Sequence, residues 1–550
     1  MFLYYKKNKI RSYNTLDYMI FYFYYPAVLL FIFLKYYGYY WANPDFVENI
    51  LYATIFYLLY IFSKNSKVKS FLKVLSLFII YTTVFLEFVV VILDYDYYSE
   101  LNTLILLETN RNEIFEFLRT RIQSIYKIGI ILILLVSPFI AKTIIKFRKL
   151  TTYIKFQKRT VNKIFVLFFI LIAILAFGRY GVDNLLKYNL LYELIYTYNY
   201  SVKRIERQKV YMKKTGIFTD AKKQPNNIQE RYIVIIGEST TRNHLSLYDY
   251  KRETNPLLSK IQKELIVYNN VISPHCQTIK SLEKVLTLGN YEESDMIYAG
   301  TIIQLLNAVG FNTYWISNQP EKGKHETLVK KISHPCKEQI FINQQKNNNS
   351  YYDEALLVPL NRILSKKEKK QFIFIHLMGT HAAYSNRYPS IFNRFNNNNN
   401  KNTKQKIVNQ YDNAVLYNDY VVYSIINLVK KINDCSFVIY FSDHGEDVFE
   451  TENKLLMHSE SIGTKPMFDI PFIVYFSNKF KENNTQLCVN PKTPYMIDDL
   501  IFSISHLLKI KFALNDSTRS IFSKDYNFGR KRIILNNENY DLKFNTTDTN

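Results

Sequence analysis

The sequence has few cysteines and no recognisable nucleic-acid-binding motif. Four of its 550 residues are cysteine, and without such a motif the chain gives no reason to expect a nucleic-acid partner. The formal net charge is nevertheless +23, and the chain holds 47 tyrosines and 40 phenylalanines. An excess of basic and aromatic side chains is typical of proteins that lie at a membrane and meet anionic partners such as phospholipid headgroups or phosphorylated glycans.

Long apolar runs occupy much of the first 180 residues, at about 18–35, 46–62, 71–93, 128–145 and 164–178. A helix needs roughly 20 residues to cross a bilayer core; the second and fifth runs are slightly short. So many runs in succession favour a membrane domain over buried helices of a soluble protein. No signal-peptide cleavage site follows the first run, so we expect it to stay as an anchor. The sequence therefore predicts a five-helix transmembrane domain over residues 1–178.

The basic loops predict how this domain is oriented. Lysine and arginine gather before the first run, between the second and third, and between the fourth and fifth. By the positive-inside rule these segments are cytoplasmic, so five crossings place everything after Gly178 on the outer side. All four cysteines lie there, an even number in a compartment where disulfides persist, and they allow three pairings among which the sequence does not choose. They are Cys276, Cys336, Cys435 and Cys488.

The exported part begins with a basic, tyrosine-rich segment, 179–230, which suits a linker on the membrane surface. Short β-branched or aromatic runs then alternate with helical segments, which predicts an α/β domain over 231–523 with a largely parallel sheet sandwiched by helices. Residues 524–550 form a polar C-terminal tail. The expected strands are Tyr232–Ile236, Thr313–Ile316, Phe372–Leu377, Phe437–Phe441 and Pro471–Phe476, and the expected helices include Ile279–Leu288, Thr301–Val309 and Val408–Ile432.

Two of the expected strands end in residues that bind metal ions. The strand in "FVIYFSDHGED" runs into Asp443 and His444, and the strand in "YIVIIGESTT" runs into Glu238. Ligand sites of such folds lie beyond the carboxyl ends of strands. Two carboxylates in one crevice repel each other unless a cation lies between them, and a mixture of oxygen and nitrogen ligands suits zinc or manganese. The alternative is an ordinary turn after each strand.

Thr278 is the best candidate for a further ligand. It lies in "SPHCQTIKSLEKVL", at the start of an expected amphipathic helix. The free N–H groups at a helix N-terminus favour a bound phosphate, and a metal-bound hydroxyl ionises more readily than a free one. The alternative is that Thr278 only caps the helix.

Five segments of the exported part follow the order of known family motifs. They are "GESTTRNHLSLYDYKRETNPLL" (237–258), "HLMGTHAAYSNRYP" (376–389), "YDNAVLYND" (411–419), "SDHGE" (442–446) and "DIPFIVY" (469–475). Together with the five-helix anchor, they resemble the membrane-bound phosphoethanolamine transferases of Gram-negative bacteria, in the alkaline phosphatase/sulfatase superfamily. "QTIKSLEKVL" is more similar to the branch that acts on core heptose than to the lipid A branch.

The resemblance implies a set of site residues. Glu238, Thr278, Asp443 and His444 would hold a catalytic zinc ion, and Thr278 would be the nucleophile that forms a phosphoethanolamine-threonine intermediate. A second zinc ion is left open. The other positions that the resemblance assigns are His381 and His458 as acid–base and substrate-binding residues, Lys322 and Glu113 as substrate-binding residues, and Glu446 as an acid near the metal. His376 lies in the expected strand, and it is either a packed histidine or a residue beside the metal.

The resemblance also implies an activity. The chain would take phosphoethanolamine from phosphatidylethanolamine, release diacylglycerol, and transfer the group to lipopolysaccharide (lipid A or core heptose) or another surface glycan. It would lie among the lipids of the bacterial inner membrane as a multi-pass protein, with its catalytic domain in the periplasm, and weaken binding of cationic antimicrobial peptides. Two alternatives are a glycerol-phosphate transferase of the lipoteichoic acid or glucan type and a non-catalytic membrane protein with the same fold.

The chain departs from the family motifs at several positions. Ala382 and Ala383 stand where the family has Gly-Pro, and Asp249 replaces the glycine of "SLYGY". Pro274 stands where the lipid A branch has a cysteine, four residues before the nucleophile.

Overall fold

The structure is a computed structural model of the whole chain, and it divides into two compact units. The first comprises residues 1–106 and 121–203, and the second comprises residues 107–120 and 204–550. The residues that the structure describes are 21–39, 41–94, 98, 102–103, 114–115, 122–148, 190–319, 327–343, 352–396, 403–451, 456–460, 462–535 and 537–545.

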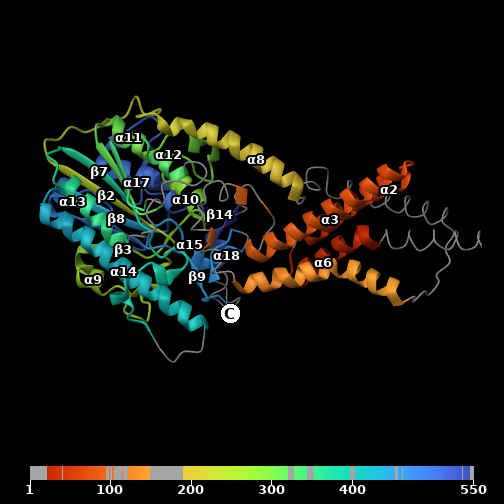
Figure 1. Cartoon of the computed structure of the whole chain (residues 1–550). Helices are drawn as coiled ribbons and strands as arrows, with labels where there is room; N and C mark the ends of the chain where they lie inside the picture. Colours follow the sequence, from red (N-terminus) through yellow and green to blue (C-terminus); the bar gives the residue numbers. More distant parts are fainter. Residues whose placement is uncertain are drawn as a thin grey trace, which may run out of the picture. The chain divides into compact units, whose positions relative to one another are not determined.

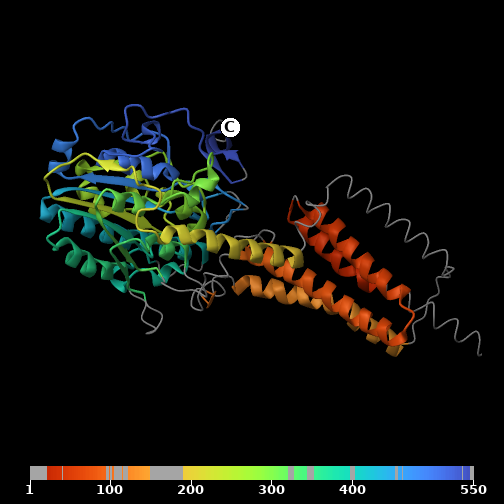
Figure 2. The ribbon, with the colours of Figure 1, turned by 90° about the horizontal axis from the view of Figure 1, so that it is seen from above.

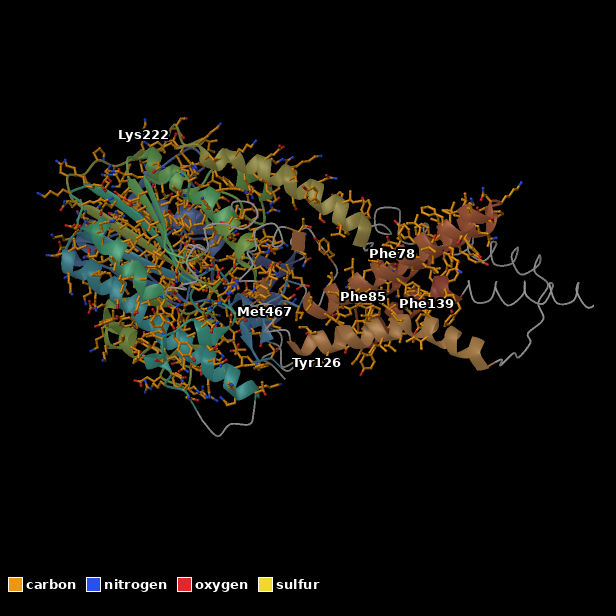
Figure 3. All side chains as sticks on the ribbon, viewed as in Figure 1. Phe78, Phe85, Tyr126, Phe139, Lys222 and Met467 are labelled. Atoms are coloured by element: carbon orange, nitrogen blue, oxygen red, sulfur yellow. The ribbon has the colours of Figure 1, made fainter. Side chains whose placement is uncertain are left out.

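Long apolar helices form the first unit (Figures 1 and 2). Three of its described helices are long and apolar enough to cross a membrane: α2 (Ala42–Phe62), α3 (Ser66–Asp94) and α6 (Ile122–Arg148). Large apolar side chains stand exposed on them, among them Phe78 of α3 and Tyr126 of α6 (Figure 3). Exposed apolar surface of this extent is expected of helices that contact lipid.

The prediction of five membrane helices is confirmed only in part. The runs at 46–62, 71–93 and 128–145 are the helices α2, α3 and α6. The described part of the first run is a shorter apolar helix, Phe21–Tyr36, and the run at 164–178 lies outside the described residues. The part of the chain that the structure describes thus contains three membrane-length helices rather than five.

A seven-stranded sheet forms the centre of the second unit (Figure 1), in the order β3-β11-β8-β2-β7-β5-β6. Each of the five expected strands is present, and two short edge strands, β3 and β6, were not predicted. The strands are β2 (Glu230–Gly237), β3 (Leu265–Tyr268), β5 (Asn312–Ser317), β6 (Glu338–Phe341), β7 (Lys370–His376), β8 (Cys435–Ser442) and β11 (Phe472–Phe476).

The sheet is mixed rather than simply parallel. The pairs β8–β2, β2–β7, β7–β5 and β5–β6 are parallel, but β11 runs antiparallel to both of its neighbours, β3 and β8. A fully buried strand reads as a continuous apolar run whichever way it points, so the sequence of β11 could not reveal its direction. The prediction of a largely parallel sheet is therefore right for the strands around β2 and wrong at the β11 edge.

Helices cover both faces of this sheet. Because successive side chains of a strand point to opposite faces, Tyr232, Val234 and Ile236 of β2 pack with one set of helices, whereas Ile233 and Ile235 pack with another. The first set is α10 (Thr278–Val285), α11 (Ile302–Ala308), α12 (Leu328–Ser333), α16 (Asn478–Asn483) and α17 (Leu500–Leu508). The second set is α9 (Pro256–Lys260), α13 (Leu357–Leu364) and α14 (Thr403–Ile432).

Two buried aspartates of α14 hold the segment that follows β2. Asp412 accepts hydrogen bonds from Tyr250 Oη at 3.0 Å and Arg252 Nη1 at 2.6 Å, and its Oδ1 lies 2.6 Å from His244 Nδ1. Asp419 accepts from the first N–H groups of α9 at 2.8 and 3.0 Å. The motifs "RETNP" and "YDNAVLYND" therefore meet in space, and their shared role is structural.

The segments on either side of the sheet domain are also ordered where the structure describes them. The expected linker contains the helix α8 (Leu190–Arg207). In the expected tail, Ile534 and Tyr540 are buried, and Arg532 pairs with Asp541. The remaining elements are β1 (Lys222–Lys223), β4 (Val271–Ile272), β9 (Asp447–Val448), β10 (Leu456–Met457), α15 (Lys465–Phe468), β12 (Tyr495–Met496), β13 (Ile510–Lys511), β14 (Ile533–Ile534), β15 (Glu538–Asn539) and α18 (Tyr540–Asn545).

The four cysteines are free thiols. Cys276 and Cys435 are buried, Cys336 is half-buried and Cys488 is exposed. The expectation that an even number of exported cysteines forms disulfides is therefore not met in this structure.

Two of the departures from the family motifs have a left-handed backbone. Asp249 has φ +67° and Ala383 has φ +62°. Asp249 stands where the family has glycine, the residue that adopts positive φ at no steric cost. Ala383 stands where the family has proline, whose ring fixes φ near −65°, so the chain here follows a path that proline forbids.

We expect Ala383→Gly to stabilise the second unit by about 1 kcal/mol, because a Cβ atom is unfavourable at positive φ. The neighbouring Ala382 does not have a positive φ, so Ala382→Gly should instead lower the free energy of unfolding by about 0.5–1 kcal/mol. Urea unfolding of both variants measures the difference. A decrease in stability for both would show that Ala383 carries no backbone strain.

Candidate active site

The carboxyl ends of β2 and β8 bring the predicted residues together. These strands are parallel neighbours, with Gly237 opposite Ser442. Glu238 and Asp443 follow directly, so both carboxylates leave the same edge of the sheet. Both side chains are buried. Parallel pairing in this register is therefore what converts two distant sequence positions into one acidic crevice.

Four predicted residues converge in this crevice. Thr278 Oγ1 lies 3.2 Å from each carboxylate oxygen of Glu238 and 3.3 Å from His444 Nε2. His444 Nε2 lies 3.4 Å from Glu238 Oε1 and 3.6 Å from Asp443 Oδ2. Thr278 is the first residue of α10, whose N-cap position is Gln277. The Thr278 hydroxyl is thus directed at the acids rather than used as a helix cap.

The orientation of His444 is set by its own turn. His444 Nδ1 lies 2.8 Å from the carbonyl oxygen of Gly445, which fixes the proton on Nδ1 and leaves Nε2 facing the crevice. A Cβ atom on Gly445 would lie 2.0 Å from the carbonyl oxygen of Pro466. Only glycine fits there, and the turn that aims His444 depends on it.

The charges of the cluster alter one another's pKa values. Burial and the charge of Glu238 raise the pKa of Asp443 to about 6. Burial would lower the pKa of His444, but the carboxylates of Asp443 and Glu238 outweigh it and raise that pKa to about 10. Burial would raise the pKa of Glu238, yet the hydrogen bond and charge of His444 lower it. Without another cation, the imidazolium is what balances the two acids.

The cluster has the donors that a zinc ion requires. One ligand atom from each of Glu238, Asp443 and His444 lies within 4.8 Å of the others, and Thr278 Oγ1 adds a fourth donor. Asp443 Oδ1 accepts hydrogen bonds from the N–H groups of Ser239 and His444 at 3.1 and 2.8 Å. Its Oδ2 is buried and accepts no hydrogen bond from any described residue. The cluster thus offers two carboxylates, an imidazole and a hydroxyl, and Asp443 Oδ2 lacks a hydrogen-bond donor in the described part of the chain. This combination of groups suits a divalent metal.

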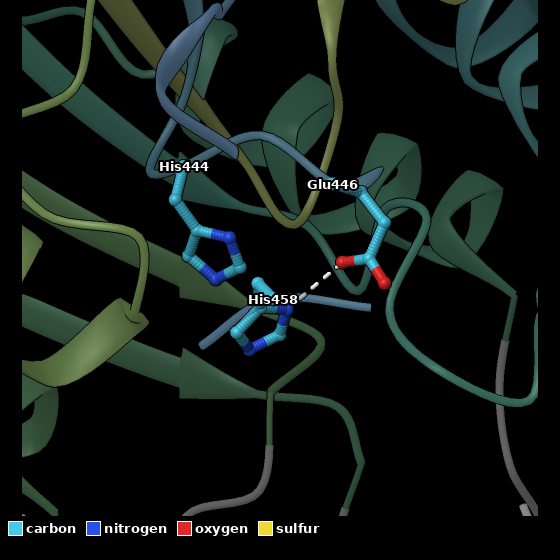
Figure 4. Close-up of side chains that lie close together, drawn as sticks. All are labelled: His444, Glu446 and His458. Carbon is cyan, nitrogen blue, oxygen red and sulfur yellow. Dashed lines mark hydrogen bonds and ion pairs between the residues drawn. The ribbon is translucent and has the colours of Figure 1, made fainter. Parts of the chain in front are cut away.

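A second group lies beside the first (Figure 4). His458 Nδ1 is 2.8 Å from Glu446 Oε2, and the rings of His444 and His458 lie 4.2 Å apart. Tyr384 Oη donates to the other Glu446 oxygen at 2.7 Å. Burial raises the pKa of Glu446 to about 7. His444, Glu446 and His458 also have ligand atoms within 4.8 Å of one another. Glu446 and His458 therefore lie next to the crevice that contains His444.

The three hydroxyls after Glu238 are buried and hydrogen-bonded. Ser239 Oγ donates to Glu238 Oε1 at 2.9 Å, and Thr240 Oγ1 donates to the carbonyl oxygen of Glu238 at 3.2 Å. Thr241 Oγ1 accepts a hydrogen bond from the Asn243 N–H at 3.4 Å. These hydroxyls shape the turn. The Ser239 hydroxyl contacts Glu238, whereas Thr278 Oγ1 lies close to both Glu238 and His444.

The remaining predicted residues differ in how far the structure describes them. His376, at the end of β7, is buried against Trp315, with ring centroids 5.9 Å apart. Burial lowers the pKa of His376 to about 4, against the opposing charge of Asp443. The charge of His381 contributes to lowering the pKa of Glu446, which places His381 near the second group. Lys322 and Glu113 lie outside the described residues.

Sequence reasoning missed Glu460, which binds the segment just before Thr278. Its carboxylate lies 3.1 Å from His275 Nδ1, accepts the Cys276 N–H at 3.0 Å and lies 4.0 Å from Lys280 Nζ. Burial would raise the pKa of Glu460, but His275 outweighs it, with Lys280 and the Cys276 N–H, and lowers the pKa to about 2. The position of Glu460 two residues after His458 is the one sequence feature that could have drawn attention to it. That spacing alone does not predict a contact with His275 or Cys276.

A family model and a curated relative match the second unit. The model described as Sulfatase matches residues 230–510. The chain is similar to phosphoethanolamine transferase EptC of Escherichia coli K12, with 33% identity over 318 residues, which cover 56% of this chain and 55% of that protein. The chain thus spans about half the length of the curated relatives it matches.

Two solved structures resemble the fold. The C-terminal periplasmic domain of EptC from Escherichia coli, in complex with Zn, has a TM-score of 0.55 and 32% identity, covering 59% of this chain and 94% of that one. The integral membrane protein lipooligosaccharide phosphoethanolamine transferase A from Neisseria meningitidis has a TM-score of 0.63 and 18% identity, covering 93% and 96%. The second likeness extends the shared fold to the membrane unit.

We expect zinc binding at the crevice to strengthen with pH. At neutral pH His444 carries a proton, because its pKa is raised to about 10, and a metal ion must displace that proton. The apparent affinity should therefore rise about tenfold per pH unit between roughly pH 6.5 and 8.5. Competition with a chromophoric chelator, corrected for the chelator's own protonation, measures it. An affinity that does not change with pH would contradict the protonated state of His444.

We expect Glu460→Gln to lower the free energy of unfolding by about 2 kcal/mol at pH 7, because charged hydrogen bonds to the nucleophile segment are lost. The folded-state pKa of Glu460 is depressed to about 2, so its stabilisation is present above the unfolded value near 4.5 and disappears as pH falls toward 2. The difference from the parent chain should therefore shrink below about pH 4. Glu482→Gln, on the exposed surface of α16, is the matched control. Equal effects of the two substitutions would refute the interaction.

Proposed function

The chain belongs to the sulfatase family, and from this premise we propose that it transfers phosphoethanolamine from phosphatidylethanolamine to a surface glycan. The observation that carries the proposal is the convergence of Thr278 Oγ1 with Glu238 and His444, at 3.2 and 3.3 Å. A hydroxyl held among acids and an imidazole is the arrangement that an activated nucleophile needs. The similarity to EptC, whose name states phosphoethanolamine transfer, supports this choice of group.

We assign the nucleophile to Thr278. Its oxygen attacks the phosphorus of the donor, the bond from phosphorus to the diacylglycerol oxygen breaks, and diacylglycerol leaves with a proton. The phosphoethanolamine group then stays on Thr278 until an acceptor hydroxyl or phosphate displaces it. Each half of this ping-pong reaction forms one P–O bond and breaks another, so the threonine is regenerated.

The surroundings of Thr278 support phosphoryl transfer. Thr278 begins α10, and Gln277 makes no side-chain cap to that helix, so the N–H groups of the first turn are available to phosphate oxygens. A zinc ion held by Glu238, Thr278, Asp443 and His444 would lower the pKa of the threonine hydroxyl and offset the charge of the phosphate. The pair His458–Glu446, 2.8 Å apart, is positioned to supply the proton to the leaving group. His381 is the alternative acid, and Lys322 would bind the donor phosphate.

The same proposal assigns the parts of the chain. Residues 231–523 would form the catalytic domain in the periplasm, and the membrane unit would hold it at the inner membrane where phosphatidylethanolamine is present. Lipopolysaccharide, through lipid A or core heptose, is the acceptor that we propose. Adding an amine to it lowers the negative charge of the surface, which would weaken the binding of cationic peptides.

We expect Thr278→Ala to abolish turnover and the covalent intermediate, because it removes the hydroxyl that lies close to both Glu238 and His444. Release of fluorescent diacylglycerol from a labelled phosphatidylethanolamine measures turnover, and mass spectrometry of the intact chain detects the adduct. Thr278→Ser keeps the hydroxyl and should retain measurable activity, whereas Ser239→Ala, which removes a neighbouring hydroxyl, should still form the adduct.

The mass of the adduct decides between the proposal and its rivals. A phosphoethanolamine group on Thr278 supports the proposal. A glycerol-phosphate group would identify a transferase of the lipoteichoic acid type instead, and full activity of Thr278→Ala would overturn the nucleophile. A folded chain that binds neither zinc nor donor would be a non-catalytic protein.

A further inference from the structure

The helix α8 has three polar residues covered, while many of its aromatic and aliphatic residues are exposed. Glu193, Thr197 and Ser201 follow one another at four-residue spacing, which places them on one side of the helix. All three are buried, with Thr197 1% and Ser201 0% exposed. A helix on the surface of a water-soluble protein has the opposite arrangement, with its apolar side against the core.

The exposed side of α8 is largely aromatic and aliphatic. The rings of Tyr192, Tyr196 and Tyr200 form a stacked ladder, with centroids 5.8 and 6.3 Å apart and planes within 11° and 20° of parallel. Ile195 is 66% exposed. The exposed apolar and aromatic residues of this side, called the tyrosine face below, are Tyr192, Ile195, Tyr196, Tyr198, Tyr200 and Val202.

The other helices of this compact unit indicate that the partner of the tyrosine face is a membrane. Residues of α8 up to Lys203 belong to the same compact unit as α2, α3 and α6, the helices of membrane length. Thr197 Oγ1 lies 2.7 Å from Thr103 Oγ1, which joins the covered side of α8 to the segment that follows α3. The helix is therefore part of the unit whose long helices are apolar enough to cross a membrane.

The composition of the tyrosine face matches the headgroup region of a bilayer. Tyrosine is enriched where hydrocarbon meets water, because its ring is apolar and its hydroxyl is polar. Lys203 follows the ladder on the same exposed side, next to the exposed residues Glu206 and Arg207, and basic residues favour anionic phospholipid. An apolar side with adjoining positive charge is typical of helices that lie in the plane of the interface.

We propose that the tyrosine face of α8 binds the surface of the bilayer, so that α8 lies in the lipid headgroup region rather than in water. Its last turn carries Arg204, which pairs with Glu283 of α10. The inference concerns a surface and not the reaction, so it stands apart from the proposed function.

Tryptophan fluorescence in lipid vesicles tests the proposal. The full chain carrying Tyr196→Trp is placed in vesicles of phosphatidylethanolamine and phosphatidylglycerol, with and without bromine on the upper acyl carbons. We expect the brominated lipid to quench the emission that the substitution adds. The parent chain has two tryptophans, and its signal is subtracted.

Val358→Trp is the matched control, because Val358 of α13 is 76% exposed but belongs to the second unit. Its added emission should not be quenched. Equal quenching of the two added tryptophans would overturn the proposal. Emission of Tyr196→Trp that shifts to the blue without quenching would also overturn it, because protein rather than lipid would then cover the tyrosine face.

Discussion

Two buried carboxylates at the ends of adjacent parallel strands impose the main physical constraint on this structure. Glu238 and Asp443 are held in a crevice where their charges repel, and Nε2 of His444 lies 3.4 and 3.6 Å from the two carboxylates and 3.3 Å from Thr278 Oγ1. Burying like charges is costly unless a cation or proton compensates them. Much of the surrounding structure can be understood as fixing this arrangement, from the register of β2 and β8 to the turn at Gly445 that aims His444.

The sequence was sufficient to predict the centre of this site. Buried strands read as apolar runs, and the polar residues that end them at Glu238 and Asp443 are conspicuous for that reason. Thr278 lies within 3.3 Å of Glu238 and His444, while the roles of all these residues stay predictions. Lys322 and Glu113, which lie outside the described residues, cannot be placed in the same way.

Other features were beyond sequence reasoning for physical reasons. An apolar run has no direction, so the reversal of β11 depends on packing with β3 and β8 that no local pattern encodes. Glu460 and His275 are 185 positions apart, and a charged residue in a loop is ordinarily solvated. The free cysteines show the same limit, because an even count and an exported location permit disulfides without requiring them. Buried ion pairs hold segments of this domain together. For example, Arg530 Nη2 lies 3.0 Å from Asp498 Oδ2.

The helix α10 is held from three directions, and this explains how a short helix can fix the position of the Thr278 hydroxyl, the nucleophile that we propose. Ser281 Oγ donates to the carbonyl oxygen of Asp443 at 2.5 Å, which ties α10 to the end of β8. Glu460 grips the segment before Thr278 from the loop that carries His458, and Arg204 of α8 pairs with Glu283. A hydroxyl that is displaced by about 1 Å loses much of its rate advantage, so contacts that fix α10 matter as much as the ligands themselves. Two of these three contacts come from segments outside the sheet, so the geometry around Thr278 depends on the loop that carries His458 and on the ion pair of Arg204.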